Sequence, residues 1–474
     1  MSRTAKTVAW NTIVQGLAKA VSLVLSLGVT MLLTRHLGVA GYGSFVAVFV
    51  YMTFFASFAD WGTQTILVRE LAQEPATFEQ QVGAALTLRL GLSLSAALIA
   101  AATVPVFYSG QPQVLVGVVI ALPTLLFGSI STTVAAAFQS QLRMGRVAVA
   151  EITAQLVSTG ILAGLVFAGR PLREVIAATV LTGALQAAIL LWLARSLVRI
   201  RPRLDLALSK RLLKRALPLG VALLLNTIYF RVDALILSTL GGASAIGVYG
   251  LAYRVCEAII GFSTIFIASM FPLLAAAARE ADVGSLRRLT QRGFDVLVLA
   301  AVPAALGVIA LAPQVVGFVA GDHFESAVPV LRVLVVGAAL MFVTGLLGHV
   351  LVAVDRQKSA MLINVAGLVL NVVLNLTLIP RFGALAAASA GTASEGFVLG
   401  CGLWLIRKHA GFTPNFRLGR RAVAAGLAMA IVLSLAGAEL FASIALGVVV
   451  YAAALWAVRA HRSLELRPLA AAKS

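Results

Sequence analysis

The chain has 474 residues, of which 60% are hydrophobic and only 12% are charged. This balance excludes a single water-soluble core, because so few polar residues cannot cover the surface of a chain this long. The formal net charge of +19 is compatible with nucleic-acid binding, but the basic residues occupy short gaps between long apolar runs. We therefore expect a membrane protein that binds no nucleic acid and whose basic residues serve topology and contact anionic headgroups.

About fourteen apolar runs follow one another along the chain, and each is close to the roughly 20 residues that cross a bilayer as an α-helix. We therefore expect an all-α polytopic membrane protein. The predicted spans are residues 9–34, 42–59, 84–108, 114–138, 147–168, 174–194, 217–240, 245–274, 294–312, 329–353, 360–379, 382–406, 422–438 and 441–458.

Basic residues alternate between the gaps that separate these spans. Counting from the N-terminal segment, 28 of the 37 Lys and Arg residues fall in every second gap. The only basic residues in the remaining gaps, which alternate with these, are Arg35, Arg170, Arg173 and Arg381. Because basic loops are retained preferentially in the cytoplasm, we expect both termini to be cytoplasmic. From the Ala- and Arg-rich composition and the lack of an organellar presequence, we expect the inner membrane of a bacterium.

The longest basic gap follows the sixth span and separates two halves that enter the membrane from the same side. The first span leaves through LLTRHLGVAGYG at residues 32–43, and the seventh leaves through LSTLGGASAIGVYG at residues 237–250. Both passages end a span at Leu-Gly and resume at Tyr-Gly, although glycine-rich turns are common enough to explain the similarity without a repeat. Two parallel six-helix lobes with a substrate site between them are a known transporter plan. We predict an N-terminal lobe at residues 1–205, a C-terminal lobe at residues 206–410, and two further helices with a cytoplasmic tail at residues 411–474.

Polar residues inside spans are informative, because a charged side chain at the bilayer centre costs from about 2.5 to more than 10 kcal/mol. In the first span, Asn11, Gln15, Lys19, Ser22 and Ser26 recur every three or four residues. They therefore share one helix face. This stripe predicts the wall of a hydrated cavity, with Lys19 as its charge.

The second half carries similar stripes. The seventh span places Asn226, Tyr229 and Asp233 on one face and Arg231 on another, and the eighth aligns Arg254 with Glu257. Further polar residues lie in the eleventh and twelfth spans: Asn364, Asn371, Asn375, Ser389, Thr392 and Glu395.

A simpler explanation of these charges is mutual neutralisation. Arg254 and Glu257 are three residues apart, the spacing of neighbours on a helix surface, and Arg231 can pair with Asp233 across an adjacent helix. Arg89 and Arg332 lie near span ends, where a long side chain reaches the headgroups, so we expect both to snorkel.

Residues typical of catalysis or cofactor binding are scattered. The two cysteines lie inside spans without metal-ligand spacing, and the five histidines form no cluster. The sequence has no Gly-Lys dipeptide and so no Walker A loop. We expect neither a metal, nor a cofactor, nor enzymatic activity.

Three stretches carry a family resemblance: LLTRHLGVAGYGSF after the first span, FADWGTQTILVREL after the second, and GVYGLAYRVCEAIIGFSTIFIASMFPLLA through the eighth. In order, spacing and length, the chain resembles the polysaccharide transporter family over essentially its whole length. These are the Wzx-type flippases of the multidrug, oligosaccharidyl-lipid and polysaccharide exporter superfamily. The resemblance implies a V-shaped, MATE-like pair of six-helix lobes plus two C-terminal helices.

The resemblance also implies a function, namely movement of an undecaprenyl-pyrophosphate-linked oligosaccharide from the cytoplasmic to the outer leaflet by alternating access. The product is O-antigen, capsule or exopolysaccharide, and the expected partners are membrane lipid, a polysaccharide polymerase and other assembly proteins. On this basis Lys19, Arg231 and Arg254 would contact phosphate. The amide side chains that would bind sugar are those of Asn11, Gln15, Asn226 and Asn371. The carboxylates that would orient these groups or carry protons are those of Asp233, Glu257 and Glu395.

Two alternatives differ in the chemistry that they need. A drug or cation antiporter of the same superfamily would need an acidic cavity, and Lys19 argues against one. A membrane polymerase or ligase for polysaccharide would need a sizeable outer loop with catalytic residues. The largest outer gap, residues 313–328, has only Asp322, His323 and Glu325 as charged or titratable groups.

Overall fold

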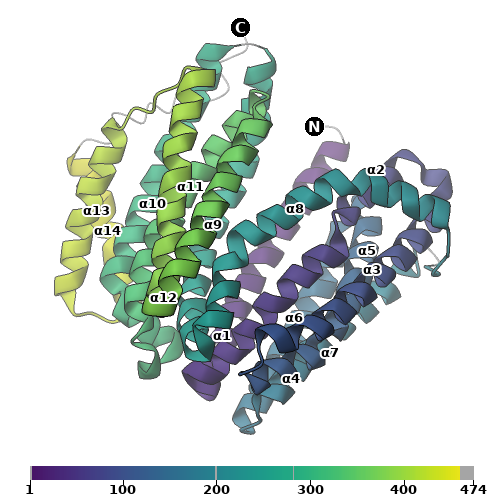
Figure 1. Cartoon of the computed structure of the whole chain (residues 1–474). Coiled ribbons are helices and arrows are strands. Elements are labelled where there is room, and N and C mark those ends of the chain that lie inside the picture. Colours follow the sequence, from purple (N-terminus) through teal and green to yellow (C-terminus); the bar gives the residue numbers. More distant parts are fainter. Residues whose placement is uncertain (1–2, 198–199, 281, 459–474) are drawn as a thin grey trace. The chain divides into compact units, whose positions relative to one another are not determined.

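The computed structural model describes residues 3–197, 200–280 and 282–458. Within these ranges the chain forms helices connected by short turns, and no strand is present (Figure 1). Twelve helices in this part of the chain are long and apolar enough to cross a membrane. The prediction of an all-α polytopic membrane protein is therefore confirmed.

Two of these helices are too long for one crossing. Helix α1 (Arg3–Asp60) has 58 residues and α12 (Gln357–Ala410) has 54. At about 1.5 Å per residue, each is more than twice the roughly 30 Å thickness of a hydrocarbon core. Gly38 (φ 65°) interrupts α1 and Gly383 (φ 56°) interrupts α12, both in a region that glycine adopts without steric cost. Each helix therefore supplies two spans, which brings the total close to the fourteen predicted.

The other helices are shorter. They are α2 (Thr63–Gln73), α3 (Phe78–Phe107), α4 (Pro112–Ala121), α5 (Pro123–Ser140), α6 (Met144–Phe167), α7 (Leu172–Ala194), α8 (Leu206–Leu240), α9 (Gly242–Arg279), α10 (Val283–Ala320), α11 (Ala327–Ala353), α13 (Arg417–Ala436) and α14 (Leu440–Ala457). Most contain one predicted span, whereas α2 lies in a predicted gap and α8 and α10 begin well before the spans predicted at residues 217 and 294.

Aspartates begin two of the long helices outside the apolar segments. Asp205 accepts a hydrogen bond from the Leu208 amide at 2.9 Å, and Asp282 accepts one from the Ser285 amide at 2.8 Å. Such N-caps satisfy an amide that has no partner within the first helical turn. Because these bonds favour the ionised carboxylate, they lower the pKa of both side chains. The Leu208 amide is the main cause for Asp205, and the Ser285 hydroxyl is the main cause for Asp282.

The contacts divide the chain into two compact units, residues 1–247 and 248–474. In the first unit, α8 packs against α1, α2 and α3; in the second, α13 packs on α10 and α14 packs on α13. The first unit therefore includes the seventh predicted span. The lobe boundaries expected at residues 205 and 410 stay predictions about the halves of the transporter.

Glycines in the first unit allow two close backbone contacts. A Cβ at Gly43 would overlap the Ala243 carbonyl, and one at Gly247 would overlap the Val39 carbonyl and lie 3.1 Å from the Gly43 Cα. Residues 39–43 and 243–247, the two passages with similar sequences, therefore lie backbone against backbone.

The second close contact joins the start of α2 to the middle of α8. A Cβ at Gly220 would lie 2.5 Å from the Trp61 carbonyl oxygen, and one at Gly62 would lie 2.9 Å from the Gly220 amide nitrogen. Trp61 (φ 44°) and Gly62 (φ 70°) both have positive φ, so the chain turns sharply between α1 and α2. This turn brings the backbone of residue 61 against α8.

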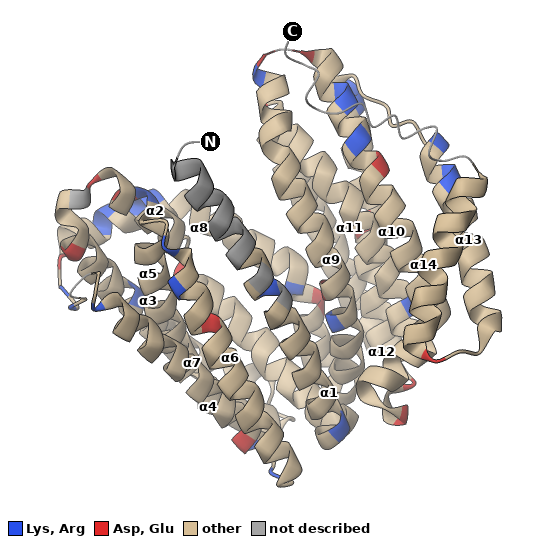
Figure 2. Ribbon diagram, turned by 180° about the vertical axis from the view of Figure 1, so that it is seen from behind, with Lys and Arg blue, Asp and Glu red and all other residues tan. Residues whose placement is uncertain are grey.

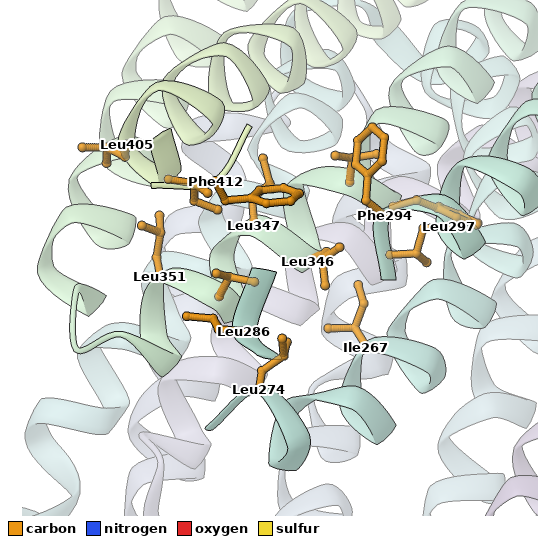
Figure 3. Close-up of a cluster of buried hydrophobic side chains, with 14 of the residues drawn as sticks. Ile267, Leu274, Leu286, Phe294, Leu297, Leu346, Leu347, Leu351, Leu405 and Phe412 are labelled. Carbon is orange, nitrogen blue, oxygen red and sulfur yellow. The ribbon is translucent and has the colours of Figure 1, made fainter. Parts of the chain in front are cut away.

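The core of the second unit is a cluster of leucine, isoleucine and phenylalanine side chains from α9, α10, α11 and α12 (Figure 3). Phe294 on α10 and Leu346 on α11 are almost fully buried within it. Inside a bilayer, helices associate through close packing rather than through exclusion of water. The interlocking side chains therefore hold this unit together.

We predict that Gly220→Ala destabilises the protein by about 1–3 kcal/mol, because the new methyl group overpacks the contact with Trp61. The lower stability should appear as a lower midpoint of thermal unfolding in detergent. Gly164→Ala on α6 is the matched control, since a Cβ there has no neighbour within 4 Å. Equal midpoints for the two variants would show that the contact at Gly220 contributes nothing.

Candidate substrate-binding site

The polar stripe of the first span lies on α1 in the first unit. Gln15 and Lys19 are exposed, and Ser22 is half-buried. Gln155 on α6 donates a hydrogen bond to the Ser22 carbonyl at 3.0 Å, which ties this part of α1 to α6. The Asn11 side chain lies outside the described residues. The structure thus leaves the Lys19 ammonium group accessible to a ligand.

Helix α8 contributes three of the predicted site residues to the same unit. Asn226 is exposed, Arg231 is half-buried, and Asp233 is buried. Asp233 accepts a hydrogen bond from the Ala234 amide at 2.6 Å. Of these three side chains, Asn226 is the most accessible to a ligand.

In the second unit, Arg254 and Glu257 form an ion pair on α9, with 2.7 Å between Nη1 and Oε2. This is the neutralisation expected from their spacing. The pair is 40% and 35% exposed, however. Both side chains are therefore partly accessible to another ligand.

The remaining candidates lie in the interior of the second unit. Asn371 and Asn375 are buried on α12, and the Asn375 amide donates to both the Asn371 carbonyl and its side-chain oxygen at 2.8 Å. Glu395, also buried, accepts a hydrogen bond from Thr344 on α11 at 3.0 Å. The asparagine bonds stay within α12, and the Glu395 bond joins α12 to α11. Sugar binding by Asn371 stays a prediction.

The expectation that Arg89 snorkels to the headgroups is wrong. Its side chain is only 1% exposed, and Nη2 donates to Asp60 at 2.7 Å and to Thr132 at 2.5 Å. Asp60 itself is 30% exposed. A charge inside a membrane protein is stabilised by an opposite charge, and Asp60 supplies it from the end of α1. Arg332, in contrast, is exposed.

A second ionic cluster was not predicted from the sequence. Glu70 on α2 is 3% exposed, and it binds Arg211 at 3.0 Å and Arg215 at 2.5 Å, both on α8. Glu74 also approaches Arg211 at 3.4 Å. The nearby carboxylates, Glu70 foremost, raise the pKa of Arg211, which lies in the polar first part of α8. This cluster fixes the beginning of α8 to α2.

Arginines spaced four residues apart on one helix face gave the only sequence signal for this cluster. Their partner, Glu70, lies more than 130 residues earlier, so the pairing depends on the fold.

The fold is similar to that of solved transporters. The lipid II flippase MurJ in an inward closed conformation matches with a TM-score of 0.80 at 14% identity, over 95% of this chain and 99% of that chain. A multidrug resistance MATE family transporter of the MOP superfamily, in an inward-facing conformation, matches with a TM-score of 0.69 at 13% identity, over 82% of this chain and 94% of that chain. The protein therefore has the fold of a MOP superfamily transporter, as predicted.

Sequence similarity identifies the family within this class. Residues 32–329, more than half of the chain, match the family described as polysaccharide biosynthesis protein. The chain belongs to this family.

Individual relatives match shorter regions. A probable low-salt glycan biosynthesis flippase of Haloferax volcanii, Agl15, is 27% identical over 35% of this chain and 35% of that protein. A probable flippase of the same organism, AglR, is 29% identical over 43% of this chain and 44% of that protein. The teichuronic acid biosynthesis protein TuaB of Bacillus subtilis is 27% identical over 29% of this chain and 28% of that protein. The chain thus matches less than half the length of each of these relatives.

We predict that Asp60→Ala destabilises the protein more than Arg89→Met does. Loss of the aspartate leaves a buried guanidinium without its counter-charge, which costs about 3–5 kcal/mol. Loss of the arginine leaves a carboxylate that is already partly exposed. Unfolding in detergent with increasing denaturant measures both costs, and a larger loss for Arg89→Met would contradict this asymmetry.

Proposed function

We propose that this protein is a flippase that moves a polyprenyl-pyrophosphate-linked oligosaccharide across the membrane by alternating access. The observation that carries the proposal is that basic side chains inside predicted spans are accessible, with Lys19 exposed on α1 and Arg254 partly exposed on α9. Membership of the polysaccharide biosynthesis protein family and the flippase names of two relatives support the same substrate class.

A pyrophosphate is the part of such a substrate that a bilayer resists most strongly, because charge is costly in a low-dielectric medium. Lys19 offers an ammonium group, and Arg254 offers planar donors that suit phosphate oxygens. Glu257 holds the guanidinium in place until an anion replaces it as the partner. The exposed amides of Gln15 and Asn226 provide donors and acceptors for sugar hydroxyls.

The direction of transport follows from the membrane potential. An inside-negative potential favours outward movement of an anion by about 2.3 kcal/mol per charge per 100 mV. Coupling to an inward cation would add to this driving force, and the buried carboxylates of Asp233 and Glu395 are the groups through which it would act.

We also propose that both termini face the cytoplasm of a bacterial inner membrane. Lys and Arg gather at the ends of several helices, including the beginning of α8 and the region around α2 (Figure 2). The positive-inside rule assigns these ends to the cytoplasm. A polysaccharide polymerase and other assembly proteins would then receive the substrate in the outer leaflet.

We predict that Lys19→Ala and Arg254→Ala each reduce flipping by about 10-fold to 100-fold, the effect of losing one hydrogen bond to a charged group. Lys19→Arg and Arg254→Lys, which keep the charge, should lose less. The measurement is surface polysaccharide in a complemented deletion strain, together with transfer of a fluorescent polyprenyl-pyrophosphate sugar between leaflets of proteoliposomes.

Lys358→Ala provides the control for this experiment, because Lys358 is an exposed lysine at the beginning of α12, outside the candidate site. It should flip substrate at the normal rate. Full activity of both site variants at normal protein levels would remove Lys19 and Arg254 from the site. No transfer of any polyprenyl-linked sugar by the unmodified protein would refute the proposed function.

A further inference from the structure

Helix α8 is longer than a membrane crossing requires. It has 35 residues and so extends about 52 Å, whereas a hydrocarbon core is about 30 Å thick. The predicted span begins at residue 217, and the preceding part of the helix contains four basic residues and no acidic one. The segment from Leu206 to Ala216 therefore extends beyond the predicted span, at an end that its basic residues assign to the cytoplasm.

One face of this segment is fixed to the rest of the first unit. Arg211 and Arg215 bind the buried Glu70, and the buried Leu212 and Ala216 pack on the same side. The preceding loop is fixed as well, since the Arg203 amide donates to the Gly83 carbonyl of α3 at 3.2 Å. The orientation of the segment about its own axis is thus determined by contacts within one unit.

The opposite face is open and combines basic with apolar side chains. Lys210 and Lys214 are exposed one turn apart, and Leu206 and Leu217 are 74% and 48% exposed one turn beyond them. These four residues recur every three or four positions and share one side of the helix. Within the described part of the chain, neither lysine forms an ion pair.

The loop before α8 extends the same combination. Arg201 and Arg203 are exposed, and Leu204, which follows Arg203, is 78% exposed. Exposed leucines beside lysines and arginines are typical of segments that lie in a membrane interface, where the apolar groups enter the acyl boundary and the charges meet anionic lipid.

We propose that residues 201–217 form an anionic-lipid docking face. In this arrangement Lys210 and Lys214 bind the phosphates of anionic phospholipids, while Leu206 and Leu217 reach the acyl chains. The occupant is the lipid surface rather than a single bound molecule, because the basic residues are distributed along the loop and two helical turns. The inference concerns lipid around the protein and does not depend on which substrate is transported.

Brominated lipids test this proposal directly. The chain has two cysteines, Cys256 and Cys401, so replacing both by alanine and introducing Leu206→Cys gives one labelling site for a fluorophore. The full-length protein is reconstituted in vesicles, and quenching by brominated phosphatidylglycerol is compared with quenching by brominated phosphatidylcholine. We expect phosphatidylglycerol to be enriched at the label. Replacement of each lysine by alanine should reduce this preference about fivefold, as expected for a basic residue near a charged surface.

Matched variants distinguish the loss of positive charge from damage to the fold. Lys210→Arg with Lys214→Arg should keep the preference, and Lys358→Ala, which removes a lysine of the second unit, should leave it unchanged at the label. High salt should weaken it, since exposed charges are screened. Equal quenching by the two lipids, or an unchanged preference in the double alanine variant, would overturn the proposal.

A competing occupant is tested in the same vesicles. Inorganic pyrophosphate is added at the ionic strength of a sodium chloride control. If both solutions reduce the preference equally, the face binds a lipid surface. If pyrophosphate displaces phosphatidylglycerol selectively, the face is a binding site for a pyrophosphate headgroup, and the lipid-docking proposal is wrong.

Discussion

The cost of placing a charge in hydrocarbon is the constraint on which the rest of this structure depends. Each ionised side chain inside or beside a span must meet a counter-charge, reach the headgroups or face water. Arg89 meets Asp60 in the interior of the first unit. Glu70 meets two arginines in the polar part of α8. Lys19 differs because its side chain is exposed. In the proposed flippase it would satisfy the constraint by facing water, as a binding residue rather than a structural one.

The same constraint explains why α8 belongs with the first unit. Opposite charges stabilise the buried Glu70 carboxylate, and both arginines that bind it come from α8. The glycine contact between Trp61 and Gly220 then brings the two backbones together one turn further along. Ionic contacts at the polar end and close packing within the apolar region thus act on the same pair of helices. The long helix is aligned along its length rather than held at one point.

The sequence predicted the fold class and nearly all spans, because apolar length and basic loops are local properties. It also identified the passages at residues 32–43 and 237–250, which the structure brings into contact at Gly43 and Gly247. Ion pairs between residues far apart in the chain could not be predicted from the sequence. Arg89 was expected to snorkel because it lies near a span end. Its pairing with Asp60 was not foreseen, because Asp60 lies 29 residues earlier, beyond a turn whose direction depends on positive φ at Trp61 and Gly62. Among the candidate site residues, burial of Asn371 and Glu395 could not be predicted, since a polar stripe faces a cavity or a neighbouring helix with the same periodicity.

The partial exposure of the Arg254–Glu257 pair is consistent with transport. A transporter must release its substrate as readily as it binds it, so a guanidinium with no counter-charge would hold a pyrophosphate too tightly in a low-dielectric site. A fully buried pair would instead exclude the substrate, because breaking it costs several kcal/mol. A pair that is 40% and 35% exposed lies between these limits. Glu257 can occupy Arg254 when no anion is bound and can compete for it when one is, which makes binding reversible. In the proposed flippase, Arg254 thus binds the pyrophosphate, and Glu257 promotes its release.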